Sequence, residues 1–308
     1  MELGSRFLCL VGCLTLTGCA AVAPTTIGDA GSTGDELLYL SNRNGNYDIY
    51  LLNITTGATR QLTQTDSDEY GLSWSPGGDR IAFGCARDGN RDIYIMPLNG
   101  TEPVRLTDHP ADDKAPAWSP DGSRIAFVST RDSERGELYV MDVTGSRITR
   151  VTFNERYEEV PAWSPDGQML AFGALAASAG GGEFLQVFVV GLENGTERQL
   201  TSLPGHNSAP RWSPDGTSIA FYGNVGEGFA GADIFRINPD GSDLVNLTYD
   251  LAPDWQPDWS PDGSRIAFSR GPGDPLDIWV MNADGSERRR VVHEAGRDEQ
   301  PHWRPRGR

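Results

Sequence analysis

A tryptophan followed by a proline-containing turn recurs through this chain at a nearly constant interval. Four copies read Trp-Ser-Pro-Asp-Gly, one reads Trp-Ser-Pro-Gly-Gly and the last reads Trp-Arg-Pro-Arg-Gly. The tryptophans are Trp74, Trp118, Trp163, Trp212, Trp259 and Trp303, separated by 44 to 49 residues. A period of this length indicates a propeller or a solenoid. Because a catalytic site is usually needed once, the repetition favours an architectural role for the motif.

Three further segments recur within each period and complete a four-stranded unit. Using one unit as the example, an apolar run follows the turn (IAF, 81–83), then alternating β-formers after an acidic residue (DIYIMP, 92–97), then a short closing strand (VRLT, 104–107). Hairpin-turn residues separate these segments. Four short strands per unit form a propeller blade. The sequence therefore predicts an all-β, six-bladed β-propeller of four-stranded antiparallel blades.

The two ends of the chain are complementary. The N-terminal unit contains LLYLSN, DIYLLN and RQLT but lacks a Trp strand, whereas the segment around Trp303 is a Trp strand without the other three. We expect the C-terminal Trp strand to join the N-terminal three strands and close the ring, which removes sheet edges that promote aggregation. The propeller is expected to span residues 37–308.

The Ser-Pro-Asp-Gly segment is interpreted as a turn. Ser at the first position, Pro at the second and Gly at the fourth are the preferences of a type I turn. A calcium loop needs several oxygen ligands from one segment, whereas each of these turns supplies a single carboxylate.

The combination of WSPDG with the IAF, DIY and LT segments resembles the WD40-like (PD40) repeat of the TolB family of propellers. This repeat also occurs in the propellers of dipeptidyl-peptidase-IV-like enzymes and oligogalacturonate lyases. The resemblance covers nearly all of residues 37–304. TolB carries a mixed α/β domain before its propeller, and here a short low-complexity stretch precedes Leu37. The resemblance implies a TolB-like lipoprotein without that domain, and the partner of TolB is not carried over.

The N-terminal residues 1–18 are predicted to be a lipoprotein signal peptide. An apolar stretch over residues 7–16 is too short to span a bilayer and is typical of a signal peptide. The quartet Leu-Thr-Gly-Cys that ends at Cys19 resembles the bacterial lipobox, whose cysteine becomes lipidated. A cleaved signal peptide with an incidental cysteine is the alternative. Residues 19–36 are interpreted as a flexible tether, so we expect a lipid-anchored protein of the bacterial cell envelope, on the periplasmic or another extracytoplasmic face.

Composition and motifs narrow the classes of function. The net charge of -17 argues against nucleic acid as a partner. The sequence contains no G-x-S-x-G, H-E-x-x-H or P-loop pattern. The four histidines, His109, His206, His293 and His302, are each alone and are interpreted as polar loop residues. No cofactor or metal site is predicted, and a channel-bound cation stays open as an alternative because the chain is acidic.

Acidic residues gather in the loops that precede the Trp strands. In a propeller these loops converge on one face around the central channel, and five of the six carry carboxylates. The candidate binding face consists of Asp68, Glu69, Asp112, Asp113, Glu158, Glu159, His206, Asp254, Asp298 and Glu299. Two Gly- and Ala-rich loops, residues 173–183 and 223–232, are expected to open on the same face. Alternatively, these carboxylates only keep the loops soluble in a chain that is acidic throughout.

These observations favour a non-catalytic envelope protein that binds a protein, peptide or glycan through this face and meets the membrane only through its lipid anchor. A metal-dependent carbohydrate lyase or hydrolase on a propeller scaffold is the alternative, and a convergent metal-binding cluster in the channel would favour it. A purely structural scaffold is a third interpretation. It predicts that no partner is enriched on pull-down.

Overall fold

The computed structural model describes residues 35–87, 89–98, 102–224, 231–271 and 275–307. The predicted signal peptide, Cys19 and all but the last two residues of the predicted tether lie outside the described residues. Within those ranges, no helix has the length and apolar character needed to cross a membrane.

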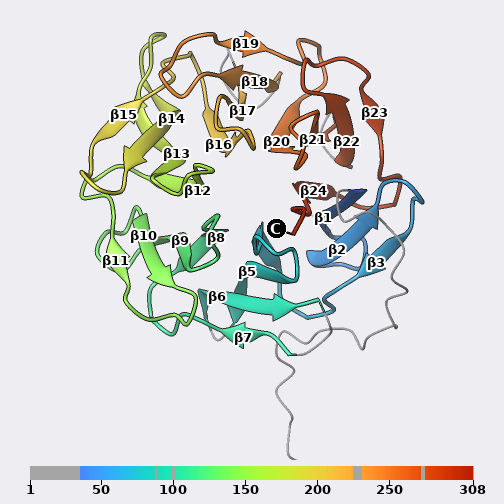
Figure 1. Cartoon of the computed structure of the whole chain (residues 1–308), viewed down its shortest axis with the longest axis horizontal. Coiled ribbons are helices and arrows are strands. Elements are labelled where there is room, and N and C mark those ends of the chain that lie inside the picture. The colour runs from blue at the N-terminus through green and yellow to red at the C-terminus, as the bar shows by residue number, and fades with distance from the viewer. Residues whose placement is uncertain (1–34, 88, 99–101, 225–230, 272–274, 308) are drawn as a thin grey trace, which may run out of the picture.

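The chain forms six four-stranded antiparallel sheets arranged as blades around a central axis (Figure 1), which confirms the predicted fold class. The innermost strands, which end in the recurring tryptophans, are β4 (Glu69–Trp74), β8 (Asp113–Trp118), β12 (Glu158–Trp163), β16 (Asn207–Trp212), β20 (Asp254–Trp259) and β24 (Asp298–Trp303). The second strands are β1 (Glu36–Ser41), β5 (Arg80–Arg87), β9 (Arg124–Ser129), β13 (Met169–Ala177), β17 (Ile219–Gly223) and β21 (Arg265–Arg270).

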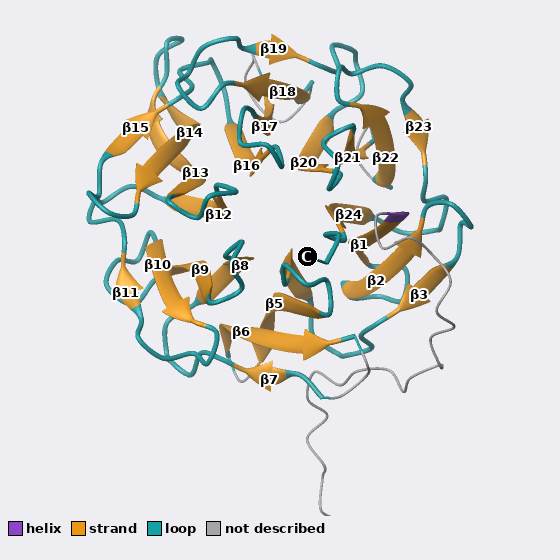
Figure 2. Cartoon of the chain, in the orientation of Figure 1, coloured by secondary structure: helices purple, strands orange, loops and turns teal. Residues whose placement is uncertain are grey.

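The outer half of each blade is built from hairpin-connected strands that shorten towards the rim (Figure 2). The third strands are β2 (Asp48–Asn53), β6 (Asn90–Pro97), β10 (Glu137–Asp142), β14 (Glu183–Gly191), β18 (Asp233–Ile237) and β22 (Asp277–Asn282). The outermost strands are β3 (Thr59–Gln61), β7 (Val104–Arg105), β11 (Thr149–Arg150), β15 (Glu197–Gln199), β19 (Val245–Asn246) and β23 (Arg289–Arg290). Outer strands of two or three residues offer little edge for pairing with another chain.

The ring closes through a blade made from both ends of the chain. Strand β24 pairs antiparallel with β1, and Trp303 lies opposite Leu37 in this pairing. The sheet order is β24-β1-β2-β3, as predicted, and the red and blue strands lie side by side in Figure 1. The backbone N–H of Arg304 also donates to the carbonyl of Glu36, with N and O 2.8 Å apart.

The hydrophobic core lies between neighbouring blades rather than at the centre of the ring. Phe127 and Phe172 are fully buried on second strands, and Trp163 on β12 is 8% exposed. One cluster joins Val128 and Leu138 of one blade to Trp163 and Phe172 of the next. Because both faces of each sheet are covered, the middle strands read as continuous apolar runs instead of alternating with polar residues.

The recurring tryptophans pack in the interfaces between neighbouring blades. Their exposed fractions range from 4 to 9%. The indole N–H of Trp163 donates to the carbonyl oxygen of Ala117 in the preceding blade at 2.9 Å. The guanidinium of Arg124, at the start of β9, lies 4.7 Å from the centre of the Trp163 ring. One aromatic side chain per period therefore connects each blade to its neighbour, which explains why the motif recurs.

The Ser-Pro-Asp-Gly segments form the predicted turns. The N–H of Gly122 donates to the carbonyl of Ser119 at 2.9 Å, and the Ser119 hydroxyl donates to Asp121 at 2.6 Å. Hydrogen bonds from Ser119 and from Ser123 hold the pKa of Asp121 down to about 2. The carboxylate therefore closes its own turn, and Gly122, at φ +75°, supplies the left-handed residue that follows it.

Every innermost strand carries a β-bulge at the same place. One extra residue separates the two halves of each strand, as between Glu159 and Ala162 of β12. The third residue of each strand has positive φ: Gly71, Ala115, Val160, Ala209, Gln256 and Gln300. At Val160, with φ 48°, this is a genuine outlier because the side chain is β-branched. Bulges re-aim side chains, and these six residues line the channel.

One of the two predicted long loops is shorter than expected. Strand β13 continues to Ala177, which pairs with Glu183 at the start of β14. The prediction of a loop over residues 173–183 is therefore wrong at both ends, because the Gly- and Ala-rich segment pairs as a hairpin with the β-forming residues after it. Residues 225–230 of the other predicted loop lie outside the described residues.

Candidate binding sites in the central channel

The central channel contains two cavities separated by a waist. The loop mouth is the cavity on the side of the loops that precede the innermost strands. It has a volume of about 530 Å³, and its lining includes Tyr70, Lys114 and Glu159. The turn mouth, on the side of the Ser-Pro-Asp-Gly turns, has a volume of about 390 Å³ and is lined by the six recurring tryptophans and the prolines after them. Arg211 and His302 line both cavities and mark the waist.

Half of the predicted face residues begin an innermost strand and are buried inside the blades. They are Glu69, Asp113, Glu158, Asp254 and Asp298, each at most 1% exposed. Glu158 is typical: it accepts hydrogen bonds from the Thr152 hydroxyl at 2.6 Å, the Asn154 amide at 2.7 Å and the Leu138 backbone N–H at 3.1 Å. Such a carboxyl ties the loop that precedes its strand to the third strand of the previous blade.

Three of these buried carboxylates are paired with arginines. Asp113 meets Arg131 at 3.0 Å through both of its oxygens. Asp254 meets Arg270 at 3.2 Å. Asp298 meets Arg43, also at 3.2 Å, across the ring closure. Buried charges are normally compensated in this way. These ion pairs therefore hold the first residue of each innermost strand in place beneath the loop that precedes it.

Glu69 and Glu158 have hydroxyl and amide partners instead of arginines. Burial raises the pKa of Glu69 to about 8, although hydrogen bonds from Thr65 and Thr63 oppose the shift. Burial likewise raises the pKa of Glu158 to about 7. Both carboxyls are therefore substantially protonated at neutral pH and contribute less negative charge to the face than the sequence suggests.

Three predicted residues occupy the position just before an innermost strand and fasten the loops to each other. Asp68 accepts the N–H of Tyr47 at 2.8 Å, and Asp112 accepts the N–H of Arg91 at 2.9 Å. His206 takes the same role with its Nδ1, which accepts the N–H of Leu185 at 3.2 Å. Each bond joins the loop to the inner hairpin of the preceding blade and so orders the face.

The last two predicted residues, Glu159 and Glu299, point to the loop mouth. Glu159 accepts a hydrogen bond from the Ser208 hydroxyl at 2.5 Å. Nearby, the Lys114 ammonium lies 4.8 Å from the centre of the Tyr157 ring. Glu299 accepts from the guanidinium of Arg297 at 2.8 Å. The mouth thus combines tyrosine rings with charges of both signs.

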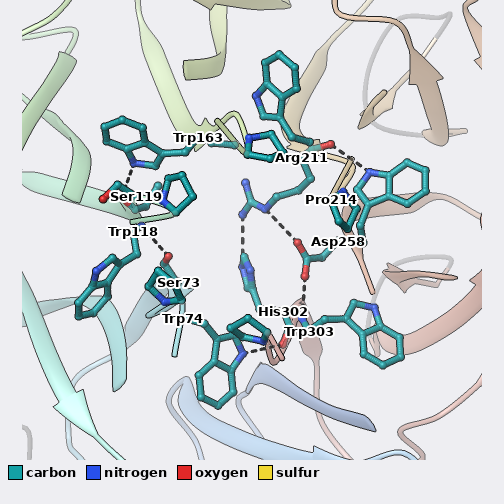
Figure 3. A pocket seen from close by; sticks show the side chains of 18 of the residues that line it. Ser73, Trp74, Trp118, Ser119, Trp163, Arg211, Pro214, Asp258, His302 and Trp303 are labelled. Atoms are coloured by element: carbon teal, nitrogen blue, oxygen red, sulfur yellow. Dashed lines mark hydrogen bonds and ion pairs between the residues drawn. The ribbon is translucent and has the colours of Figure 1, made fainter. Parts of the chain in front are cut away.

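The waist carries a polar cluster that motif reasoning missed. Arg211, Asp258 and His302 lie on three consecutive innermost strands, one residue before the tryptophan (Figure 3). The Arg211 Nε lies 3.6 Å from an Asp258 oxygen, and its Nη2 lies 3.4 Å from His302 Nε2. The other Asp258 oxygen accepts the N–H of Trp303 at 2.7 Å.

A signal for this cluster was present in the repeat. The residue before each tryptophan is small in β4, β8 and β12, where it is Ser73, Ala117 or Ala162. In the other half of the ring it is charged or polar. Because the rest of the repeat is regular, the change of residue type at this one position indicates a local role that the other blades do not share. The prediction that His302 is a polar loop residue is wrong, because His302 lies within β24 and is 8% exposed.

Burial controls the charges at the waist. It raises the pKa of Asp258 to about 7, although Arg211 lowers it. Burial, and then the Arg211 charge, hold the pKa of His302 well below its usual value, so the imidazole is neutral at neutral pH. Because a guanidinium only donates, His302 Nε2 is the acceptor of the contact with Arg211. Across the described ranges, no three His, Cys, Asp or Glu side chains are grouped so as to hold a metal ion.

Comparisons with known proteins agree with this architecture. Residues 25–181 and 161–308 match the family model described as the TolB beta propeller domain (PD40). The structure of TolB from Acinetobacter baumannii is 21% identical, with a TM-score of 0.75, and the match covers 89% of this chain and 68% of that one. A putative TolB from Agrobacterium tumefaciens is 24% identical, with a TM-score of 0.70 and coverage of 85% and 91%.

A third similar structure comes from an enzyme. It is an oligogalacturonate lyase in complex with manganese, 17% identical, with a TM-score of 0.55 and coverage of 84% of this chain and 74% of that one. At these identities the structural likeness shows the fold alone. A sequence search of curated proteins gave no match.

Proposed function

Because the chain belongs to the TolB β-propeller family, we propose that it is a non-catalytic binding protein of the bacterial envelope, which captures a segment of a partner protein at its loop mouth. The observation that carries this proposal is the composition of the mouth. Tyr47, Tyr70, Tyr157 and Tyr222 surround a cavity of about 530 Å³ together with Lys114 and Glu159. Rigid tyrosine rings bury a large area at low entropic cost, and they are enriched in recognition surfaces.

The charges in the mouth favour a partner segment that carries both signs. Lys114 and Glu159 lie on neighbouring strands, β8 and β12, and both are partly buried. A charge that is desolvated on binding must meet its complement, so this pair selects its partner and sets its orientation.

Apolar side chains on the surrounding loops support a protein rather than a small glycan as the partner. Phe153, on the loop before β12, is 75% exposed. Tyr249 and Leu251, on the loop before β20, are 86% and 98% exposed. Large apolar side chains exposed around a binding face are typical of protein interaction sites. They extend the recognition surface beyond the mouth itself.

The predicted lipid anchor at Cys19 would hold the propeller at the membrane. Metabolic labelling with a clickable fatty acid should mark the wild-type protein, whereas Cys19→Ser should carry no label and should leave the membrane fraction. A labelled Cys19→Ser variant, or a wild-type protein without label, would remove the anchor from the proposal.

The binding proposal is tested by cross-linking and affinity capture from intact envelopes. The loop-mouth variant combines Lys114→Met with Glu159→Gln, and the matched control combines Arg289→Met with Glu287→Gln at the exposed outer rim. Both variants lose one charge of each sign, so the net charge is unchanged. We expect wild type and control to capture the same partner, and the loop-mouth variant to capture it at least about tenfold less, since the loss of a single charged contact, worth about 1.5–3 kcal/mol, already gives that factor. Equal capture by all three proteins would refute the proposal.

A further inference from the structure

We infer that the turn mouth is a second binding site, distinct from the loop mouth, and that Arg211 at its floor takes the carboxylate of a small monoanionic ligand. The inference rests on the shape of this cavity, on the hydrogen bonds that Arg211 leaves unused and on the charges beside it. It does not depend on the partner proposed for the opposite face.

The turn mouth has the size and the walls of a small-molecule site. Its volume of about 390 Å³ lies within the usual range of about 300–1,000 Å³ for ligand cavities. The tryptophans are at most 9% exposed, so their faces pack between the blades and the wall presents their edges and the neighbouring proline rings. Figure 3 shows this collar surrounding the polar floor. A largely apolar wall with a few polar groups at its base is the usual design of a site that orients a small ligand.

The floor is asymmetric in a way that leaves room in front of the guanidinium. Arg211, Asp258 and His302 occupy one half of the ring, on β16, β20 and β24. In the other half the equivalent side chains are Ser73, Ala117 and Ala162 (two methyl groups and a hydroxymethyl group). A ligand can therefore occupy the half with the small residues and still reach the arginine.

The Arg211 guanidinium has N–H donors that its contacts within the protein do not use. Its Nη1 donates to the carbonyl of Pro210 at 3.0 Å, and its Nη2 approaches His302 Nε2 at 3.4 Å. Each of these nitrogens carries a second hydrogen, for which the described part of the chain records no acceptor. Two such hydrogens on one guanidinium match the two oxygens of a carboxylate. The Arg211 side chain is 19% exposed, so it is accessible from the cavity.

Asp258 and His302 restrict the charge of the ligand. The 3.6 Å separation between Arg211 and Asp258 is longer than the roughly 2.7–2.9 Å of a direct charge-assisted hydrogen bond, so Asp258 positions the guanidinium without saturating it. Its own negative charge disfavours dianions such as phosphate. His302 is neutral and adds no second positive charge. The site therefore suits a single carboxylate on a small, partly apolar body.

Both a polypeptide C-terminus and an acidic sugar present this chemistry, and the experiment separates them. Purified full-length protein is titrated at pH 8 with N-acetyl-leucine and its neutral counterpart N-acetylleucinamide, and with glucuronate and its neutral counterpart glucose. Binding is followed by calorimetry and by the fluorescence of the tryptophan collar. We expect at least one acid to bind, and its neutral counterpart to bind about tenfold more weakly or not at all, which is the usual effect of losing a charged hydrogen bond. The acid that binds identifies the source.

Two substitutions should move the affinity in opposite directions, which a loss of folding cannot do. Arg211→Gln should weaken binding of the acid about tenfold, whereas Asp258→Asn should strengthen it, because a competing negative charge is removed. Arg289→Gln, at the exposed outer rim and away from the cavity, is the matched control and should change the affinity less than twofold. The loop-mouth variant should also bind as wild type does, so this inference and the proposed function can fail independently.

Three results would overturn the inference. They are the failure of both acids to bind at millimolar concentration, equal binding of an acid and its neutral counterpart, and an affinity that Arg211→Gln leaves unchanged.

Discussion

Replacement of Trp303 by alanine tests the closure of the ring at the interface that completes it. Trp303 is 4% exposed and packs against Leu37 and Tyr39 from the N-terminal strand. The guanidinium of Arg265 lies 4.6 Å from the centre of its ring. Truncation of a buried tryptophan costs about 3–5 kcal/mol, and the lost cation–π contact adds about 0.5–1 kcal/mol. We therefore expect the free energy of unfolding to fall by about 3.5–6 kcal/mol.

Trp163 is the matched comparison, because it occupies the same position in a blade that is continuous in sequence. It is 8% exposed, and Arg124 lies 4.7 Å from its ring centre. Its indole N–H also donates to Ala117 at 2.9 Å, whereas the Trp303 indole has no acceptor among the described residues. Loss of that hydrogen bond is worth about 1 kcal/mol. Trp163→Ala should therefore cost about 1 kcal/mol more than Trp303→Ala.

Urea unfolding followed by far-ultraviolet circular dichroism measures both losses without depending on tryptophan fluorescence. Large losses in both variants, in the expected order, would support a ring whose closing blade is packed like the others. A loss below about 1 kcal/mol for Trp303→Ala beside one of about 3 kcal/mol or more for Trp163→Ala would show that β24 does not complete the core. In that case the closed propeller would be refuted.

Three further predictions concern the buried carboxyls and the bulges. The pKa of Glu69 is raised to about 8 in the fold, so the stability it contributes is present below its unfolded pKa of about 4.3 and is lost as the pH rises through about 8. Between pH 5 and pH 8, the free energy of unfolding in urea should therefore fall less for Glu69→Gln than for wild type. Equal falls in the two proteins would contradict this prediction. Carboxylate binding at the turn mouth should strengthen between pH 8 and pH 6, because Asp258, with a pKa of about 7, becomes neutral while His302 stays neutral and the Arg211 guanidinium keeps its charge. Titrations should lose this pH dependence in Asp258→Asn. Val160→Gly should leave the free energy of unfolding nearly unchanged, because relief of about 1–2 kcal/mol of left-handed strain offsets the loss of the side chain. Val187→Gly, which removes a fully buried side chain, should lower the free energy of unfolding clearly in the same assay.

Glutamine is a suitable replacement at position 69 because it copies the protonated carboxyl. The Thr65 hydroxyl lies 2.7 Å from the carbonyl of Ser67 and 2.8 Å from Glu69 Oε1. In the second contact the Thr65 hydroxyl donates to Glu69. Glutamine is neutral, as the protonated carboxyl is, and its amide oxygen can accept the same hydrogen bond.

Ten candidate face residues could be selected from the sequence because propeller topology brings equivalent loops to one face. Their separate roles could not be predicted. Glu158 and Glu159 are adjacent and chemically identical, yet Glu158 is buried beneath its loop and Glu159 lines the loop mouth. Successive residues of a strand point to opposite sides, and the bulge that follows them determines which side faces the channel.

The sequence by itself determined the architecture of this protein. Its repeat defines four strands per blade, its turns are local, and its complementary ends specify how the ring closes, because each of these depends on short-range patterns that recur six times. The tertiary structure alone decided which polar side chains meet. Arg211, Asp258 and His302 are separated by more than forty residues from one strand to the next. The repeat places each of them one residue before a tryptophan, but it does not show that they meet. They come together because closing the ring places the same position of three successive strands at the waist of one channel.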